Sequence, residues 1–234
     1  MNTAMPRNPL EAAFSRQIIS PPPGVALAGY FAPRPNQGIL DDLHVRVALF
    51  RSAGTVVGLI HFDLMEVPLW LCRKIRSRVA HLDRHLADNL VIAATHTHTA
   101  PELREARDQV HQHALDYVLN QALAAVDTAR WRFAPVEIEA LTLADNPLAF
   151  NRRFWMTDGT VVTNPGKLNP RIDRPEGPVD PEIHVALLRQ FGRPAACLVN
   201  LGNHTDTMGG DRVSADWPGV LERCLQTHVG SQLP

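Results

Sequence analysis

The stretch from Leu90 to Pro101 constrains the fold more than any other part of this sequence. It opens with an apolar run of strand length and continues as Thr95-His96-Thr97-His98-Thr99-Ala100-Pro101. Because successive side chains of a strand alternate between its two faces, His96 and His98 are expected to point the same way. Pro101 cannot donate to a sheet ladder and turns the chain into a loop. We therefore predict a strand that ends in two histidines able to meet one cation or one substrate.

A third histidine follows another apolar run. Residues 195–199 are strand-like, and His204 comes shortly after them. Ligands of open α/β sheets bind at the carboxyl ends of strands, and neutral imidazoles are good zinc ligands. A catalytic zinc ion typically has three protein ligands. The pattern predicts His96 and His204 as zinc ligands, with His98 as a ligand or a proton shuttle. The alternative is that the histidines are surface residues bonded to water, because a His-x-His pair is a short motif.

The remaining periodicity predicts an α/β fold, a mixed β-sheet with flanking helices and the metal site at the sheet rim. The second strand of a hairpin, an amphipathic helix and the histidine strand form a parallel crossover unit. The predicted strands are residues 43–50, 55–62, 90–94, 135–143, 182–190 and 195–199, and the predicted helices are 68–86, 102–129 and one that starts near Asp216. Asp63, which closes the second strand, is expected either to cap the next helix or to serve as a metal-site carboxylate.

The amino-terminal segment differs in composition from the rest. It is polar and ends in Pro21-Pro22-Pro23-Gly24, a run that cannot be helical. We predict an extended arm over residues 1–24 and an α/β domain over residues 25–234.

Composition narrows the classes of function. The chain has 234 residues, a net charge of −1 and no basic block, which argues against nucleic acid as a partner. No apolar run approaches the roughly 18 residues of a transmembrane segment, and the amino terminus lacks the apolar core of a secretory signal. Three widely spaced cysteines, Cys72, Cys197 and Cys224, argue against a disulfide framework. We expect a cytoplasmic protein.

An ordered set of short motifs resembles the amino-terminal catalytic domain of the neutral/alkaline ceramidases. The order and rough spacing agree from about residue 25 onward. The motifs are Gly29-Tyr30, Gly38-Ile39 with Asp41-Asp42-Leu43, residues 95–101, Asn151-Arg152, Asp180-Pro181-Glu182, Asn203-His204-Thr205 and Ser214-Ala215-Asp216-Trp217-Pro218-Gly219.

The resemblance implies a zinc-dependent amidase that cleaves an N-acyl bond. His96 and His204 then correspond to zinc ligands, His98 to a catalytic or substrate-contacting residue, and Arg152 to a substrate contact. The implied chemistry is attack on an amide carbonyl by zinc-activated water, with a histidine moving protons. The implied partner is a small N-acyl amide or lipid-like molecule.

The sequence departs from the family's pattern in two ways. Ceramidases that act on membrane lipid are usually exported or membrane-associated, whereas this chain shows no export signal, so a soluble N-acyl amide is as much expected as a substrate as ceramide. In that family a glutamate and a tyrosine complete the zinc site downstream of the aspartate-x-proline-glycine helix, and this chain ends before them. We therefore expect the chain to correspond to the amino-terminal portion of the domain, with the carboxy-terminal part missing. The missing part should leave a sheet edge or an apolar face uncovered, so we expect a homo-oligomer or another partner to cover it. The alternatives to an amidase are a non-catalytic binding or assembly module, and a metal-dependent ester or lactone hydrolase on the same scaffold.

Overall fold

The computed structural model describes residues 9–104 and 108–229, which form two compact units. Among these residues, the first unit comprises those up to Ile138, Leu188–Cys197 and those from His204 onward. The second unit comprises Glu139–Leu187 and Leu198–Asn203.

A five-stranded mixed sheet forms the centre of the first unit. Its strand order is β6-β5-β4-β1-β7, where β6 is Leu90–Ala94, β5 is Thr55–Phe62, β4 is His44–Ser52, β1 is Glu11–Ile18 and β7 is Ala134–Pro135. β5 and β6 are parallel, whereas β4 pairs with β5 and β1 in antiparallel fashion. The predicted hairpin, the parallel crossover and the mixed α/β class are confirmed.

Residues 1–8 of the extended arm predicted over residues 1–24 lie outside the described part of the chain, and the prediction is wrong for Glu11–Ile18. These residues form β1, which lies inside the sheet between β4 and β7. The sequence pattern does not predict this strand because one of its inward positions is Ser15, a polar residue. The Ser15 hydroxyl donates to the carbonyl of Ala125 at 2.6 Å. A satisfied hydroxyl can be buried at little cost, but it gives no apolar signal in the sequence.

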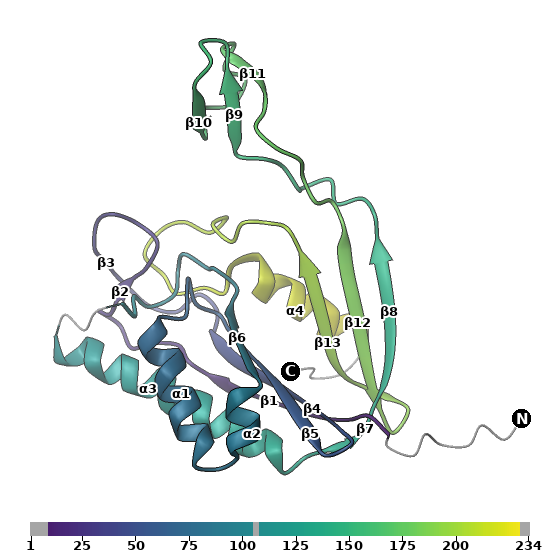
Figure 1. Ribbon diagram of the computed structural model, residues 1–234. Coiled ribbons are helices and arrows are strands. Elements are labelled where there is room, and N and C mark those ends of the chain that lie inside the picture. Colours follow the sequence, from purple (N-terminus) through teal and green to yellow (C-terminus); the bar gives the residue numbers. More distant parts are fainter. Residues whose placement is uncertain (1–8, 105–107, 230–234) are drawn as a thin grey trace, which may run out of the picture. The chain divides into compact units, whose positions relative to one another are not determined.

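Three helices cover one face of this sheet (Figure 1). They are α1, Leu69–Ala80, α2, Arg84–Asp88, and α3, Gln109–Arg130. The helix predicted over 68–86 is split because the carboxylate of Asp83 caps α2 by accepting from the N–H of Leu86 at 3.0 Å. The helix predicted from 102 begins only after Asp108, which caps α3 in the same way.

The main core lies between the sheet and these helices. Val45, Val47 and Leu49 alternate along β4 and are buried, and α3 buries Ala122 and Ala125 in the same cluster. Burial of each large aliphatic side chain stabilises the fold by about 1.5–3 kcal/mol, an upper estimate for a compact unfolded chain. This layer fixes the carboxyl end of β6, from which His96 and His98 follow.

The last helix, α4, Asp216–Val229, contacts the opposite face of the same sheet through its Glu222. Because neighbouring strand residues face opposite ways, Arg16 points away from α3, and its guanidinium pairs with Glu222 of α4 at 2.7 Å. Arg46 bonds both Glu222 and the buried carboxylate of Asp63. The prediction that Asp63 caps a helix is wrong, since its oxygens are taken by Arg46 and by the N–H of His44 at 2.8 Å.

The smaller sheets complete the two units. In the first unit β2, Ala26–Leu27, pairs with β3, Arg34–Pro35. In the second unit the order is β10-β9-β11, with β9 Arg153–Met156, β10 Val161–Thr163 and β11 Ile172–Pro175. A further three-stranded sheet has the order β13-β12-β8, with β8 Glu137–Leu143, β12 Ile183–Gln190 and β13 Arg193–Leu201.

Candidate metal centre

His96 and His98 lie in a loop that continues the direction of β6 without being part of it. The N–H of Thr95 still donates to the carbonyl of Phe62 at 2.9 Å, and the N–H of His96 donates to that of Leu64 at 2.8 Å. His96 then adopts a left-handed backbone conformation, with φ of 70°. A non-glycine residue in this region is uncommon and marks a local constraint. Both imidazoles point to one side, as predicted, but through this turn rather than through strand alternation.

The threonines on either side of His98 anchor the loop from its buried side. The hydroxyls of Thr97 and Thr99 donate to the carbonyl of Ser214 at 2.9 and 2.8 Å, and both side chains are fully buried. The Ser214 hydroxyl in turn donates to Asp41 at 2.7 Å. Because both hydroxyls donate to one buried carbonyl, these contacts restrict the conformation of the loop.

His204 is brought to the same place by contacts between its loop and the loop after β6. The hydroxyl of Thr205 donates to the carbonyl of Thr95 at 2.5 Å, and the N–H of His98 donates to the carbonyl of Thr205 at 3.3 Å. The indole N–H of Trp217 donates to the carbonyl of His204 at 3.1 Å. Two segments more than 100 residues apart are thereby held side by side.

The buried carboxylate of Asp216 fixes the remainder of the His204 loop. It accepts hydrogen bonds from the N–H of Thr207 at 2.9 Å, from the N–H of Met208 at 2.8 Å and from the N–H of Trp217 at 2.6 Å. The Thr207 hydroxyl is a fourth donor. Burial raises the pKa of Asp216, but these donors outweigh that effect and hold the pKa below its ordinary value.

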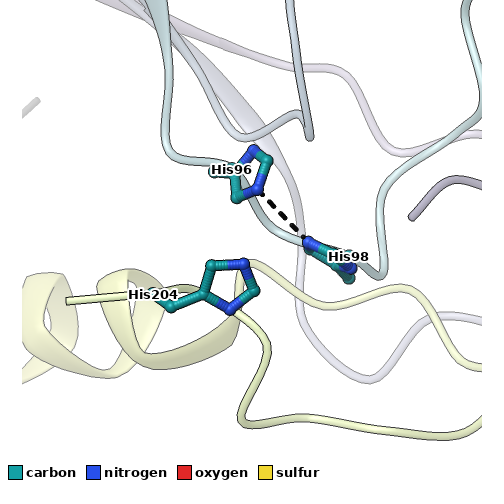
Figure 2. A group of neighbouring side chains, drawn as sticks. All are labelled: His96, His98 and His204. Atoms are coloured by element: carbon teal, nitrogen blue, oxygen red, sulfur yellow. Dashed lines mark hydrogen bonds between the residues drawn. The ribbon is translucent and has the colours of Figure 1, made fainter. Parts of the chain in front are cut away.

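The three imidazoles form a nearly equilateral triangle (Figure 2). Their ring centroids are 4.9 Å apart for His96 and His98, 5.0 Å for His96 and His204, and 4.9 Å for His98 and His204. One ring nitrogen from each lies within 4.8 Å of the others. The Nε2 atoms of His96 and His98 are 3.4 Å apart. Three neutral imidazoles at this spacing can hold one metal ion.

The orientation of the His96 ring is set by a backbone carbonyl. Its Nδ1 lies 2.8 Å from the carbonyl oxygen of Met65, which can only accept a hydrogen bond. In the neutral ring Nδ1 therefore carries the proton, and Nε2 presents its lone pair to the triangle. Such hydrogen bonds from the outer nitrogen are the usual support of a metal-binding histidine.

His98 is more enclosed than His96. A Cβ placed on Gly29 would lie 2.4 Å from its Nδ1, so only glycine fits against this ring. Burial lowers the pKa of His98, and the nearby carboxylate of Asp206 opposes that effect. The lowered pKa favours the neutral imidazole, which is the form that can bind a metal ion or accept a proton.

Arg152, the fourth residue singled out from the sequence, lies in the second unit. It is exposed and directly precedes β9, and its carbonyl accepts from the N–H of Asn164 at 2.8 Å. Its proposed role as a substrate contact stays a prediction. Sequence reasoning predicted no role for three residues that contact the triangle, which are Met65, Gly29 and Asp206. Only Gly29 gave a signal, as part of a motif shared with the ceramidases.

Comparison with known proteins gave matches in structure. No family model matches this chain, and a search of the curated proteins found no match. Neutral ceramidase from Pseudomonas aeruginosa matches with a TM-score of 0.73 and 18% identity, covering 96% of this chain and 37% of its own. A ceramidase complexed with C2 matches with a TM-score of 0.77 and 16% identity, covering 97% of this chain and 36% of its own.

This chain therefore spans a little over a third of the length of the solved structures it matches. Nearly all of its own length takes part in the match. The resemblance to the ceramidases that the motifs predict is confirmed at the level of structure: the chain has the fold of a portion of neutral ceramidase.

Proposed function

We propose that this chain is part of a zinc-dependent hydrolase that cleaves an N-acyl amide bond. The observation that carries the proposal is the convergence of His96, His98 and His204 on one point. The fold shared with neutral ceramidase supports the class of reaction, and so does the resemblance of the motifs around the three histidines to the ceramidase family.

The donor set suits zinc. Imidazole nitrogens bind zinc at about 2.0–2.1 Å, so two ligands of a tetrahedral ion lie about 3.3 Å apart. The Nε2 atoms of His96 and His98 are separated by 3.4 Å. Hard ions such as magnesium and calcium prefer oxygen ligands, which a cluster of three imidazoles does not offer.

The three histidines have different roles in this proposal. His96 and His204 hold the ion, and His98 either completes the set of three ligands or moves a proton between water and the leaving amine. A zinc ion bound here would polarise an amide carbonyl and lower the pKa of water toward about 7. The lone pair on Nε2 of His96, fixed by Met65, is available for the ion without rearrangement.

The substrate in this proposal is a small N-acyl amide or a lipid-like amide, with Arg152 as a contact for its polar part. Within residues 9–104 and 108–229, none of the helices combines the length and the apolar character needed to cross a bilayer. A cytoplasmic location stays a prediction.

Metal content tests the proposal directly. After dialysis against zinc and removal of free ion, we expect about one zinc per chain by elemental analysis. Replacement of both His96 and His204 with alanine should abolish it. His113→Ala is the matched control, because His113 is an exposed histidine on α3 outside the triangle. Unchanged stoichiometry in the double variant would overturn the proposal.

Hydrolysis of soluble short-chain N-acyl amides by the zinc-loaded chain then tests the reaction. Release of a fatty acid that depends on His98 supports an amidase. Cleavage of esters or lactones alone would point to a different leaving group. Zinc binding with no hydrolysis, together with a stable oligomer, would point to the non-catalytic module instead.

A further inference from the structure

A small polar assembly surrounds the outer side of His98 and is not used by the metal-binding proposal. It consists of Tyr30, Arg34 and Asp206. The hydroxyl of Tyr30 donates to Oδ1 of Asp206 at 2.8 Å, and the guanidinium of Arg34 lies 4.0 Å from the centroid of the Tyr30 ring. The same ring meets the imidazole of His98 edge-on, with centroids 5.8 Å apart.

Arg34 ties this assembly together. Its Nη2 donates to the carbonyl of Ala28 at 2.9 Å and to that of His98 at 2.5 Å, and its Nη1 donates to the carbonyl of Gly210. The three carbonyls belong to three different loops. Since the guanidinium is planar and its donors are fixed in direction, the loops cannot shift independently of one another.

The outer nitrogen of His98 faces the free oxygen of Asp206. Nδ1 of His98 is buried and has no hydrogen-bond partner among the described residues, and Oδ2 of Asp206 lies 3.8 Å from it. A lone pair on Nδ1 would be repelled by the carboxylate, whereas an N–H would be attracted. A buried polar atom without a partner is costly, which favours the arrangement that pairs it.

We propose that Asp206 is the positioning residue of His98. The Tyr30 hydroxyl donates to Oδ1 of Asp206 and so fixes the carboxylate. Oδ2 of Asp206 then favours the tautomer of neutral His98 that carries its proton on Nδ1, so that Nε2 presents its lone pair to the triangle. What Nε2 does there rests on the proposed function, but the orientation itself does not. His96 and His98 would then both offer Nε2, one supported by a backbone carbonyl and the other by a carboxylate.

Two other arrangements compete with this one. In the first, Nε2 of His98 carries the proton and donates to Nε2 of His96, 3.4 Å away. In the second, Nδ1 carries the proton but is held by the backbone of Gly29, which packs against the ring. The first predicts the opposite tautomer, and the second predicts a tautomer that does not depend on Asp206.

The tautomer of each histidine can be read by long-range ¹H–¹⁵N NMR of the metal-free chain at a pH where the rings are neutral. We expect the bare nitrogen of His98 to be Nε2 in the natural sequence and to move to Nδ1, at least in part, in Asp206→Asn. The matched control is Asp211→Asn, which changes an exposed carboxylate in the same loop. His96 should keep its bare Nε2 throughout, which shows that the fold is intact.

A bare Nδ1 on His98 in the natural sequence would overturn the proposal, and so would an unchanged tautomer in Asp206→Asn. Should that variant prove unstable, Tyr30→Phe gives the same test from an exposed position, because the carboxylate loses its anchor. A partial shift of the bare nitrogen to Nδ1 is then expected, and no shift would contradict the proposal. None of these measurements depends on zinc, so their failure differs from failure of the proposed function.

Discussion

The loop after β6 and the loop after β13 both bring histidines to the triangle, but the first is anchored by several separate groups, whereas the part of the second that follows Thr205 is anchored largely by one carboxylate. Thr95, Thr97 and Thr99 tie the first loop to three other segments. In the second, Thr205 bonds to the first loop, and beyond it three donors of Thr207 and Met208 converge on Asp216, together with the N–H of Trp217 from α4. A loop that is held by several separate bonds should keep its conformation when one bond is lost. A segment that is held by one carboxylate should not. The His204 side of the site is therefore expected to be the more fragile.

Asp216→Asn should have the largest effect. The amide keeps the size of the side chain but loses the charge, and its NH₂ group opposes at least one of the four donors. We expect a loss of about 3 kcal/mol in the free energy of unfolding, because hydrogen bonds to a buried charged group are broken together. Zinc affinity should fall as well, since the loop segment that follows His204 is held less firmly.

Chemical denaturation and zinc titration by calorimetry measure the two effects of Asp216→Asn. Asp211→Asn serves as the exposed control from the same loop. A stable variant with normal zinc affinity would show that the His204 loop does not depend on this carboxylate.

Gly29→Ala should come next. Its Cβ would lie 2.4 Å from Nδ1 of His98, and φ is +91°. The control is Gly24→Ala, at a φ of +89° with no atom within 4 Å of the added Cβ. Both variants suffer the backbone strain, about 1 kcal/mol or more. The additional loss in Gly29→Ala, about 1–2 kcal/mol with weaker zinc binding, measures the clash with His98. Equal losses in the two variants would refute this contact.

Much of the fold could be predicted from sequence because its core elements carry regular apolar patterns. Val45, Val47 and Leu49 alternate along β4, and the run in β6 is apolar throughout. β1 could not be recognised, since Ser15 and Arg16 are stabilised by Ala125 and Glu222, more than 100 residues away. A local pattern cannot reveal partners at such a distance.

The three histidines of the candidate site could be predicted from sequence, but the groups that orient their rings could not. The His-x-His pair and His204 could be selected because each follows an apolar strand, although the reason expected for the shared direction of His96 and His98, strand alternation, does not apply since β6 ends at Ala94. The left-handed backbone at His96, the carbonyl of Met65 and the carboxylate of Asp206 depend on tertiary contacts. These features decide which ring nitrogen faces the triangle, and short sequence motifs do not encode them.

Thr97→Val should have a smaller effect than either variant above. The substitution removes the bond from the Thr97 hydroxyl to the carbonyl of Ser214, but Thr99 still donates to the same oxygen. We expect a loss of about 1 kcal/mol in the free energy of unfolding and an unchanged zinc affinity. A loss as large as that of Asp216→Asn would remove the distinction between the two loops.

The smallest expected effect concerns pH. Burial lowers the pKa of His98 below its ordinary value of 6.5, so the unfolded chain binds more protons there than the folded chain. This contribution to stability is present above pH 6.5 and is lost as the pH falls toward the lower, folded pKa. In metal-free protein, His98→Asn should therefore lose less stability on acidification than the natural sequence. Chemical denaturation of both proteins across this pH range measures the difference. The same change in the free energy of unfolding with pH for the two proteins would contradict the expectation.

X-ray absorption at the zinc edge tests the central claim most directly, because it reports which atoms surround a bound ion. For the zinc-loaded chain, we predict imidazole nitrogens at about 2.0–2.1 Å as the main scatterers, reduced in His96→Ala and in His204→Ala. A shell of sulfur or of oxygen alone, or a nitrogen shell that neither variant alters, would contradict the convergence of these histidines on one ion.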